Sequence, residues 1–193
     1  MSSQNPHENQ NYGEIQKVSK RKMNSKTRKQ VMFICQAGLI AALYTVLTIV
    51  SAYFGLASYE IQVRISEALT VLPLFTPAAI PGLTVGCILG NISSPFGVWD
   101  IIFGSLATLL AAVCARKLRN IKIKGFPLLS ILMPVIFNAL IVGAEITFLF
   151  PTDAPSLTAF VLAALEVGAG ELAVCLAGGI PLYFAINKTK VFK

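Results

Sequence analysis

Six apolar stretches, separated by short polar segments, follow one another along most of the chain. A helix that spans a bilayer needs about 20 predominantly apolar residues. The first stretch, Val31 to Leu56, exceeds this length, and three later ones are each predicted to form one span: Ile101–Ala115, Phe126–Phe150 and Leu157–Ile186. The pattern predicts an all-α integral membrane protein, a compact bundle of six transmembrane helices.

The remaining two spans are expected within the apolar segment 65–99, which four prolines interrupt. About 16 helical residues rise roughly 24 Å, so the segment has room for two short crossings with a break near Thr76–Gly82. Proline and glycine breaks at membrane depth are tolerated where neighbouring protein satisfies the freed backbone groups. A re-entrant hairpin is the alternative interpretation of this segment.

The charges are confined to the ends and loops of this pattern. We predict a basic polar tail over 1–29, a membrane domain over 30–187 and a short basic tail over 188–193. Six spans place fifteen of the sixteen Lys and Arg residues on one side, with Arg64 the exception. Cytoplasmic loops carry an excess of Lys and Arg, so both termini are predicted to be cytoplasmic in a multi-pass protein of the cell membrane.

Composition narrows the function classes. Charged residues make up 13% of the chain, about half of the roughly 25% typical of soluble domains. The net charge of +7 follows from membrane topology, so no nucleic acid is expected as a partner. The only histidine, His7, lies in the tail, and the four cysteines are far apart in apolar surroundings. With no nucleotide-phosphate loop or hydrolase pattern, we expect no metal, no cofactor and no enzymatic activity.

Seven of the nine acidic residues lie in the spans or outer loops. An aspartate inside a span costs about 3 kcal/mol on insertion scales, so such residues often mark a ligand or ion path. Glu67, Asp100 and Glu145 are expected in the outer half of the membrane, and Glu166 near its middle. Glu166 and Glu171 are about 140° apart around a helix, so one is expected in a pocket and the other in a structural or subunit contact.

Several polar residues are candidates for binding, each with a structural alternative. Asn138 and Glu145 share one helical face, and either line a pocket or bond a neighbouring helix. Arg64 and Glu67 are one turn apart, and either pair with each other or offer a donor and an acceptor to a ligand. Trp99 fits an interfacial aromatic belt or a stacking platform for a planar ligand.

Small residues recur every fourth position in three of the expected spans. They are Ala37 and Ala41 in the first span, Gly82, Gly86 and Gly90 in the third, and Ala107, Ala111 and Ala115 in the fourth. Small residues let helix backbones approach closely, either within one bundle or between subunits. On spacing alone, neither use is favoured for the first pair.

The run from Gln62 to Gly82, Gln-Val-Arg-Ile-Ser-Glu-Ala-Leu-Thr-Val-Leu-Pro-Leu-Phe-Thr-Pro-Ala-Ala-Ile-Pro-Gly, resembles the signature of the QueT family. The segment Gly86–Asn91 (Gly-Cys-Ile-Leu-Gly-Asn) and the six-span layout are similar too. The resemblance covers roughly residues 30–187, and the Arg-Ile-Ser-Glu-Ala-Leu stretch is its specific part. The long basic tail departs from it.

The resemblance implies the substrate-binding S component of an energy-coupling factor (ECF) transporter, specific for a queuosine precursor. Such a component binds its substrate from outside and docks on a transmembrane coupling subunit served by two ATPase subunits. It also implies that Ala37 and Ala41 dock against the coupling subunit. A deazaguanine base with an aminomethyl arm would use carboxylates for its N–H groups and its amine, and Arg64 for its carbonyl.

Two other classes remain open. A small proton-coupled secondary transporter of a cationic or nucleobase-like solute would need an intramembrane acid that exchanges protons, for which Glu166 is the candidate. A membrane-embedded enzyme is disfavoured because the chain lacks a catalytic constellation.

Overall fold

The computed structural model describes residues 24–56, 63–123, 125–150 and 154–189. The chain divides into two units, Met1–Phe33 and Ile34–Lys193. Of the first unit, only Asn24–Phe33 is described, and nine of these residues form the start of helix α2 (Ser25–Tyr53). The predicted tail 1–29 therefore lies largely outside the described residues. The rest of α2 and every later element belong to the second unit.

The described part of the second unit is helical and contains no β-strand, only an isolated bridge between Ile123 and Phe126. After α2 come η1 (Ile65–Leu74), α3 (Ala79–Gly90), η2 (Asn91–Ser93), α4 (Val98–Leu118) and α5 (Leu128–Leu149). The last segment runs through α6 (Leu157–Val174), the single π-turn η3 (Cys175–Gly179) and α7 (Ile180–Thr189) without a break. The predicted all-helical class is confirmed.

Four of these segments are long and apolar enough to cross a membrane: Ser25–Tyr53, Val98–Leu118, Leu128–Leu149 and Leu157–Thr189. Their bounds lie within a few residues of the predicted apolar stretches, except that the first helix begins six residues earlier. The segment 65–99 instead holds two shorter apolar helices, Ile65–Leu74 and Ala79–Ser93, with the break between them at Phe75–Ala78.

Proline placement explains why this region is short and broken. Pro73 lies inside η1, where it has no N–H to donate, and Arg116 of α4 donates to its carbonyl oxygen at 2.8 Å. Pro77 lies in the break, and Pro81 falls in the first turn of α3, where proline is tolerated. The prolines therefore divide this region into two short helices, η1 and α3, in place of one long helix.

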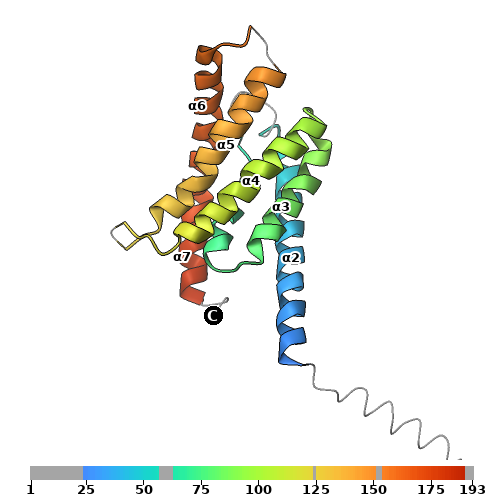
Figure 1. Ribbon diagram of the computed structural model, residues 1–193, viewed down its shortest axis with the longest axis vertical. Coiled ribbons are helices and arrows are strands. Elements are labelled where there is room, and N and C mark those ends of the chain that lie inside the picture. The colour runs from blue at the N-terminus through green and yellow to red at the C-terminus, as the bar shows by residue number, and fades with distance from the viewer. Residues whose placement is uncertain (1–23, 57–62, 124, 151–153, 190–193) are drawn as a thin grey trace, which may run out of the picture. The chain divides into compact units, whose positions relative to one another are not determined.

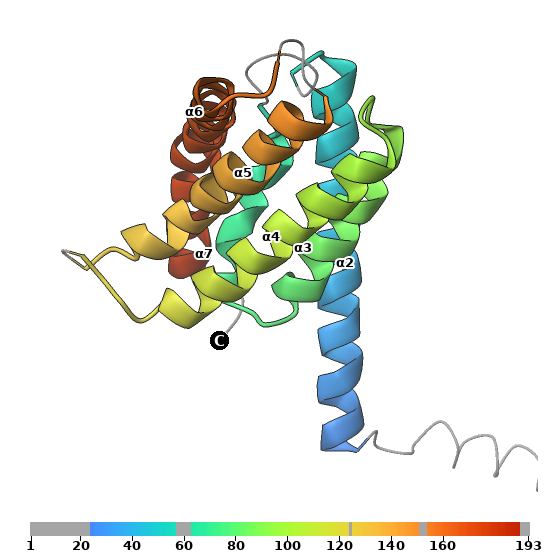
Figure 2. The same ribbon diagram turned by 45° about the horizontal axis from the view of Figure 1, so that its top comes forward.

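Successive helices pack side by side, α3 on α4, α4 on α5 and α5 on α6 (Figure 1). The short helix η1 contacts α3, α4, α5, α6, η3 and α7, and it lies between α3 and α7 in Figure 2. A 3₁₀ run of ten residues is unusual, since such runs rarely exceed four. Helix η1 is thus held by its neighbours, and it places its polar residues in the interior of the unit.

Candidate functional site

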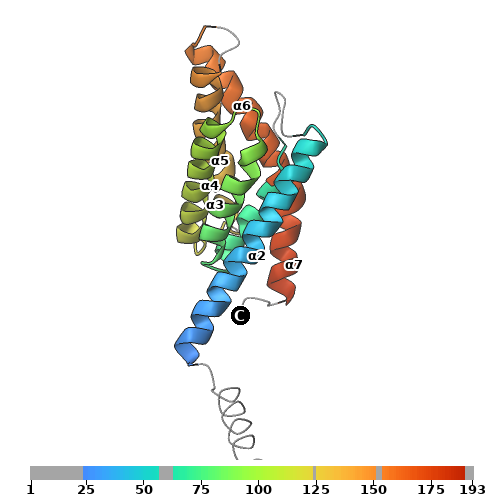
Figure 3. The same ribbon diagram turned by 90° about the vertical axis from the view of Figure 1, so that its right-hand side faces the viewer.

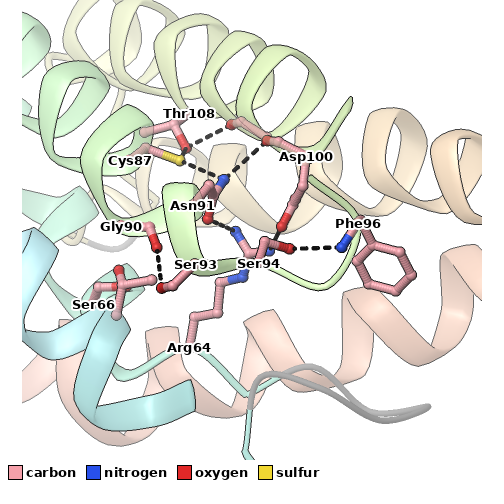
Figure 4. Close-up of polar contacts among 12 residues, drawn as sticks. Arg64, Ser66, Cys87, Gly90, Asn91, Ser93, Ser94, Phe96, Asp100 and Thr108 are labelled. Atoms are coloured by element: carbon pink, nitrogen blue, oxygen red, sulfur yellow. Dashed lines mark hydrogen bonds and ion pairs between the residues drawn. The ribbon is translucent and has the colours of Figure 1, made fainter. Parts of the chain in front are cut away.

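A buried polar network joins the N-terminal end of η1 to α3 and α4 (Figure 4). The Arg64 guanidinium donates to both carboxylate oxygens of Asp100, at 3.0 and 2.9 Å, and to Oδ1 of Asn91 at 3.2 Å. Asn91 in turn donates to the backbone oxygen of Asp100 at 2.9 Å. All three side chains are buried. The two charges are paired with each other, and the Asn91 amide accepts one hydrogen bond and donates another. We call this network of Arg64, Asn91 and Asp100 the lock.

Helix α2 positions the start of η1 through a polar stripe on one face. Tyr44, Thr48 and Ser51 are spaced at i, i+4 and i+7, and all three are buried. Tyr44 donates to Oε1 of Glu67, Thr48 and Ser66 hydroxyls are hydrogen-bonded at 2.8 Å, and Ser51 accepts the Ile65 N–H at 2.9 Å.

A glycine makes room for the lock on α4. A Cβ atom at Gly104 would lie 2.8 Å from Nδ2 of Asn91 and 3.2 Å from Oδ1 of Asp100. Contacts this short with polar atoms already held on both sides require the network to shift. The absence of a side chain at this position therefore lets Arg64, Asn91 and Asp100 meet.

Beside the lock lie buried carboxyl groups whose oxygens lack hydrogen-bond partners among the described residues. Both oxygens of Glu145 and the Oε2 atoms of Glu67 and Glu171 are in this state, as is Nδ2 of Asn138. The three acids are only 4%, 2% and 4% exposed, respectively. Buried polar groups are normally hydrogen-bonded, and an unpaired one costs free energy. Such groups indicate a place for a ligand, water or ion.

These acids form one electrostatic cluster with the lock. Glu145 of α5 interacts with the charges of Asp100 and Arg64. Glu171 of α6 interacts with those of Glu67 and Arg64. Four elements thus bring their ionisable groups to one interior region, although the residues are far apart in the sequence. The described residues contain no group of three or more ligands suited to a metal ion.

Two other predicted site residues, Trp99 and Glu166, are exposed. Trp99 is 48% exposed and stacks on Phe103 one turn away, with ring centroids 6.2 Å apart. Glu166 is exposed on α6 beside the exposed Leu162 and Leu165, whereas Glu171 is buried. Asn138 is buried on the same α5 face as Glu145. At a rise of 1.5 Å per residue, it lies about 10 Å nearer the start of the helix.

The small-residue pair of α2 packs inside the unit, where α2 crosses α3 (Figure 3). A Cβ at Gly82 would lie 2.8 Å from the Ala37 oxygen, and one at Gly86 would lie 2.8 Å from the Ala41 oxygen. Ala41 is 7% exposed and Ala37 half-buried. The four-residue spacings of the first and third spans therefore serve the contact between these two helices, as close packing requires.

Two residues of this region, Tyr44 and Asn91, were not among the predicted site residues, and Glu171 was considered only as the alternative to Glu166. Tyr44 sits in an apolar stretch, and only its spacing with Thr48 and Ser51 signals a polar stripe. Asn91 ends the Gly82-Gly86-Gly90 helix and is the sole amide within that apolar region. For Glu171, the sequence shows an acid within an apolar stretch but does not show whether its side chain faces the interior.

An apolar groove of about 360 Å³ lies between η1 and the α6–η3 segment. It is lined by Val63, Ile65, Ala68, Ala173, Val174, Ala177 and Gly178. None of these side chains is ionisable or donates a hydrogen bond. The groove therefore does not account for the unpartnered acids, which lie inside the unit.

Comparison with known proteins identifies relatives of the chain. The family model described as "QueT transporter" matches residues 34–188. A curated relative, the "Queuosine precursor transporter QueT" of Lactococcus lactis subsp. cremoris (strain MG1363), is 35% identical over 77 residues, which cover 40% of this chain and 45% of that protein. The chain thus spans about half the length of the curated relative it matches. No solved structure matches the chain.

Proposed function

The chain belongs to the QueT transporter family, which makes it a multi-pass membrane transport component rather than an enzyme, and from this premise we propose that it is the substrate-binding S component of an ECF importer. In this role it binds a queuosine precursor, a deazaguanine base, from outside. A coupling subunit and two ATPase subunits then drive release inside.

The observation that carries the proposal is the cluster of unpartnered buried acids. A guanine-like edge presents several N–H donors, and a carboxylate accepts such donors in pairs. Within the described part of the chain, both oxygens of Glu145 and one oxygen each of Glu67 and Glu171 have no hydrogen-bond partner. Arg64 is already paired with Asp100, so the site as a whole presents acceptors. This favours a donor-rich or cationic ligand and disfavours a phosphorylated one.

Loading from outside requires the acids to lie toward the outer side. We propose six crossings with both termini cytoplasmic, the orientation that the Lys and Arg distribution favours. In a cysteine-free variant, a new cysteine at the exposed position Ala154 should react with an impermeant thiol reagent in intact cells, whereas one at Asn120 should react only after permeabilisation. The reverse pattern, or equal labelling of both, would contradict this orientation.

Docking on the coupling subunit remains a proposal for helix α2. Ala37 and Ala41 face α3, so leucine at both would disturb the unit itself. Gly38 and Ala42 have the same spacing on the exposed side, and a Cβ at Gly38 meets no atom within 4 Å. If α2 docks through its outer face, Gly38→Leu/Ala42→Leu abolishes uptake and leaves ligand binding unchanged. Normal uptake by this variant would mean that the coupling subunit does not dock on this face of α2.

The decisive test is uptake and binding measured on the same variants. Cells that express this chain with the coupling and ATPase subunits should accumulate a labelled deazaguanine base, and omission of either partner should stop accumulation. Calorimetric titration of the purified chain should show binding of the base without partners. Glu166→Gln is the matched control, because its carboxylate is exposed away from the cluster. Partner-independent uptake that collapses with the proton gradient and with Glu166→Gln would instead support a proton-coupled transporter.

A further inference from the structure

The segment that joins α4 to α5, residues 119–127, turns back on itself; residue 124 lies outside the described residues. Ile123 and Phe126 exchange two backbone hydrogen bonds, at 2.9 and 3.1 Å, and Gly125 between them adopts a φ of +83°. Glycine takes this left-handed conformation without strain, so it suits a tight reversal of the chain. The segment therefore forms a small hairpin, which projects away from the helices in Figure 1 and Figure 2.

The base of the hairpin is fixed by aromatic contacts, whereas its tip is exposed. The Phe126 ring lies edge-on to the Tyr183 ring of α7, with centroids 5.3 Å apart, and stacks on the Phe184 ring at 5.7 Å. Ile121 and Ile123, by contrast, are 49% and 51% exposed. Two branched apolar side chains are thus held on the surface of a projecting turn.

The surroundings of these isoleucines are basic. Lys117, Arg119 and Lys122 lie in the hairpin or within the last turn of α4, and the sequence has no Asp or Glu between positions 101 and 144. In the described part of the chain, the one ion pair is that of the lock, so these three cations form none. The hairpin therefore presents apolar side chains and unneutralised positive charge together.

The length of α4 places this surface at the level of the lipid headgroups. Its 21 residues rise about 31 Å, and the hydrocarbon core of a bilayer is about 30 Å thick. The hairpin follows directly on the end of α4, so it begins where the hydrocarbon ends. Segments that combine Lys and Arg with apolar side chains bind at this boundary, because the apolar groups enter the edge of the acyl chains and the cations contact acidic headgroups.

We propose that the hairpin is an interfacial anchor that binds the surface of a bilayer with anionic phospholipids. Its two isoleucines enter the acyl boundary, and its three unpaired cations contact the headgroup phosphates. Because the hairpin joins α4 to α5 and is fixed to α7 through Phe126, its depth in the membrane constrains the ends of these helices. The partner is a lipid surface, so this inference does not depend on the ligand of the proposed function.

The depth of the hairpin can be measured with an indole at its tip. Ile123→Trp is made together with Trp99→Phe, which removes the only native tryptophan, and the full chain is reconstituted into vesicles of phosphatidylcholine and phosphatidylglycerol. We expect indole emission at a shorter wavelength than in water. Phosphatidylcholine brominated near the headgroup end of its acyl chains should quench this emission more strongly than lipid brominated near the methyl end.

Asn120→Trp is the matched control, since Asn120 is an exposed polar position of the same hairpin. Its indole should be quenched less than that of Ile123→Trp by both brominated lipids. Emission typical of water from Ile123→Trp, or equal quenching of the two variants, would overturn the anchor. If Ile123→Trp does not elute as a single folded species, Ile121→Trp gives the same measurement.

Charge variants identify the lipid. In Lys117→Gln/Arg119→Gln/Lys122→Gln, quenching in the mixed vesicles should fall to the level seen in phosphatidylcholine alone. Each cation lost should shift the equilibrium between the inserted and the water-exposed hairpin about fivefold toward water, the effect of one Lys or Arg near an anionic surface. Quenching that depends neither on phosphatidylglycerol nor on these cations would overturn the anionic headgroup as the partner. A short-wavelength emission that appears only after the coupling subunit is added would assign the hairpin to a protein contact and overturn the proposal as well.

Discussion

Two neighbouring regions of this interior contain the same kinds of residue in opposite states. In the lock, Arg64, Asn91 and Asp100 are hydrogen-bonded to one another. In the adjoining acid cluster, Glu67, Glu145 and Glu171 keep oxygens without partners among the described residues. Both regions are buried, so solvent exposure does not explain the difference. A fully hydrogen-bonded buried network makes the structure rigid, whereas unpaired buried polar groups cost free energy unless something else satisfies them.

This comparison predicts that charge removal destabilises the lock but weakens binding in the acid cluster. The largest effect is expected from Asp100→Asn, which leaves the buried Arg64 guanidinium without a carboxylate. Breaking one side of a buried ion pair costs about 3–5 kcal/mol. Denaturant or thermal unfolding in detergent should show this loss in the free energy of unfolding. A stability close to wild type would mean that the lock is not a structural element.

Glu145→Gln should give the opposite result. Both oxygens of Glu145 are unpartnered, so a neutral amide of the same shape removes a buried charge and costs the fold little. Ligand affinity should fall by about ten- to a hundred-fold, equivalent to roughly 1.5–3 kcal/mol. Titration calorimetry measures the affinity, and an unfolding curve on the same preparation serves as the control. Lost stability with normal binding would place Glu145 in a helix–helix contact instead.

Gly104→Ala tests the lock without changing any charge. Its methyl group would meet Asn91 and Asp100 at 2.8 and 3.2 Å, and overpacking of this kind costs about 1–3 kcal/mol. The matched control is Gly38→Ala, where a Cβ meets nothing within 4 Å and alanine favours the helix by up to about 1 kcal/mol. Unfolding measurements should therefore move in opposite directions for the two variants. Equal shifts would show that glycine flexibility matters more than the lock.

The smallest effects are expected at the exposed candidates. Trp99→Phe and Glu166→Gln alter side chains outside both regions, and such surface changes usually stay within about 0.5 kcal/mol. Affinity for the deazaguanine base should change less than about twofold in titrations of each variant. A large loss of binding in Trp99→Phe would instead mean that Trp99 stacks on the ligand.

Helix positions and the acidic character of the site were predictable because they depend on local composition. A bilayer-length apolar stretch must become a helix to satisfy its backbone, so the bounds of α4, α5 and the continuous segment Leu157–Thr189 lie within a few residues of the predicted apolar stretches. The prolines at 73, 77 and 81 predicted a break near its observed position. Each intramembrane carboxylate was conspicuous for the same reason, since it is costly wherever it lies.

The partners of these residues were not predictable, because they come from distant parts of the chain. Arg64 was expected to pair with Glu67 one turn away or to face a ligand, yet its partner is Asp100, 36 residues on. The spacing of Ala37 and Ala41 predicts close packing against a helix but does not say which one. The structure shows that the helix is α3, at Gly82 and Gly86. Spacing along one helix defines a face but not the element that covers it.

The order of apolar and polar residues was enough to predict an all-helical membrane chain with costly acids in its apolar segments. Tertiary structure alone decided which acids turn inward: Glu171 is buried near Glu67, whereas Glu166, five residues earlier, is exposed. The physical reason is that α6 is apolar on all sides, so no amphipathic pattern distinguishes its faces. Packing against α5 and η1 selects the buried face, and with it which of the two acids lies in the interior.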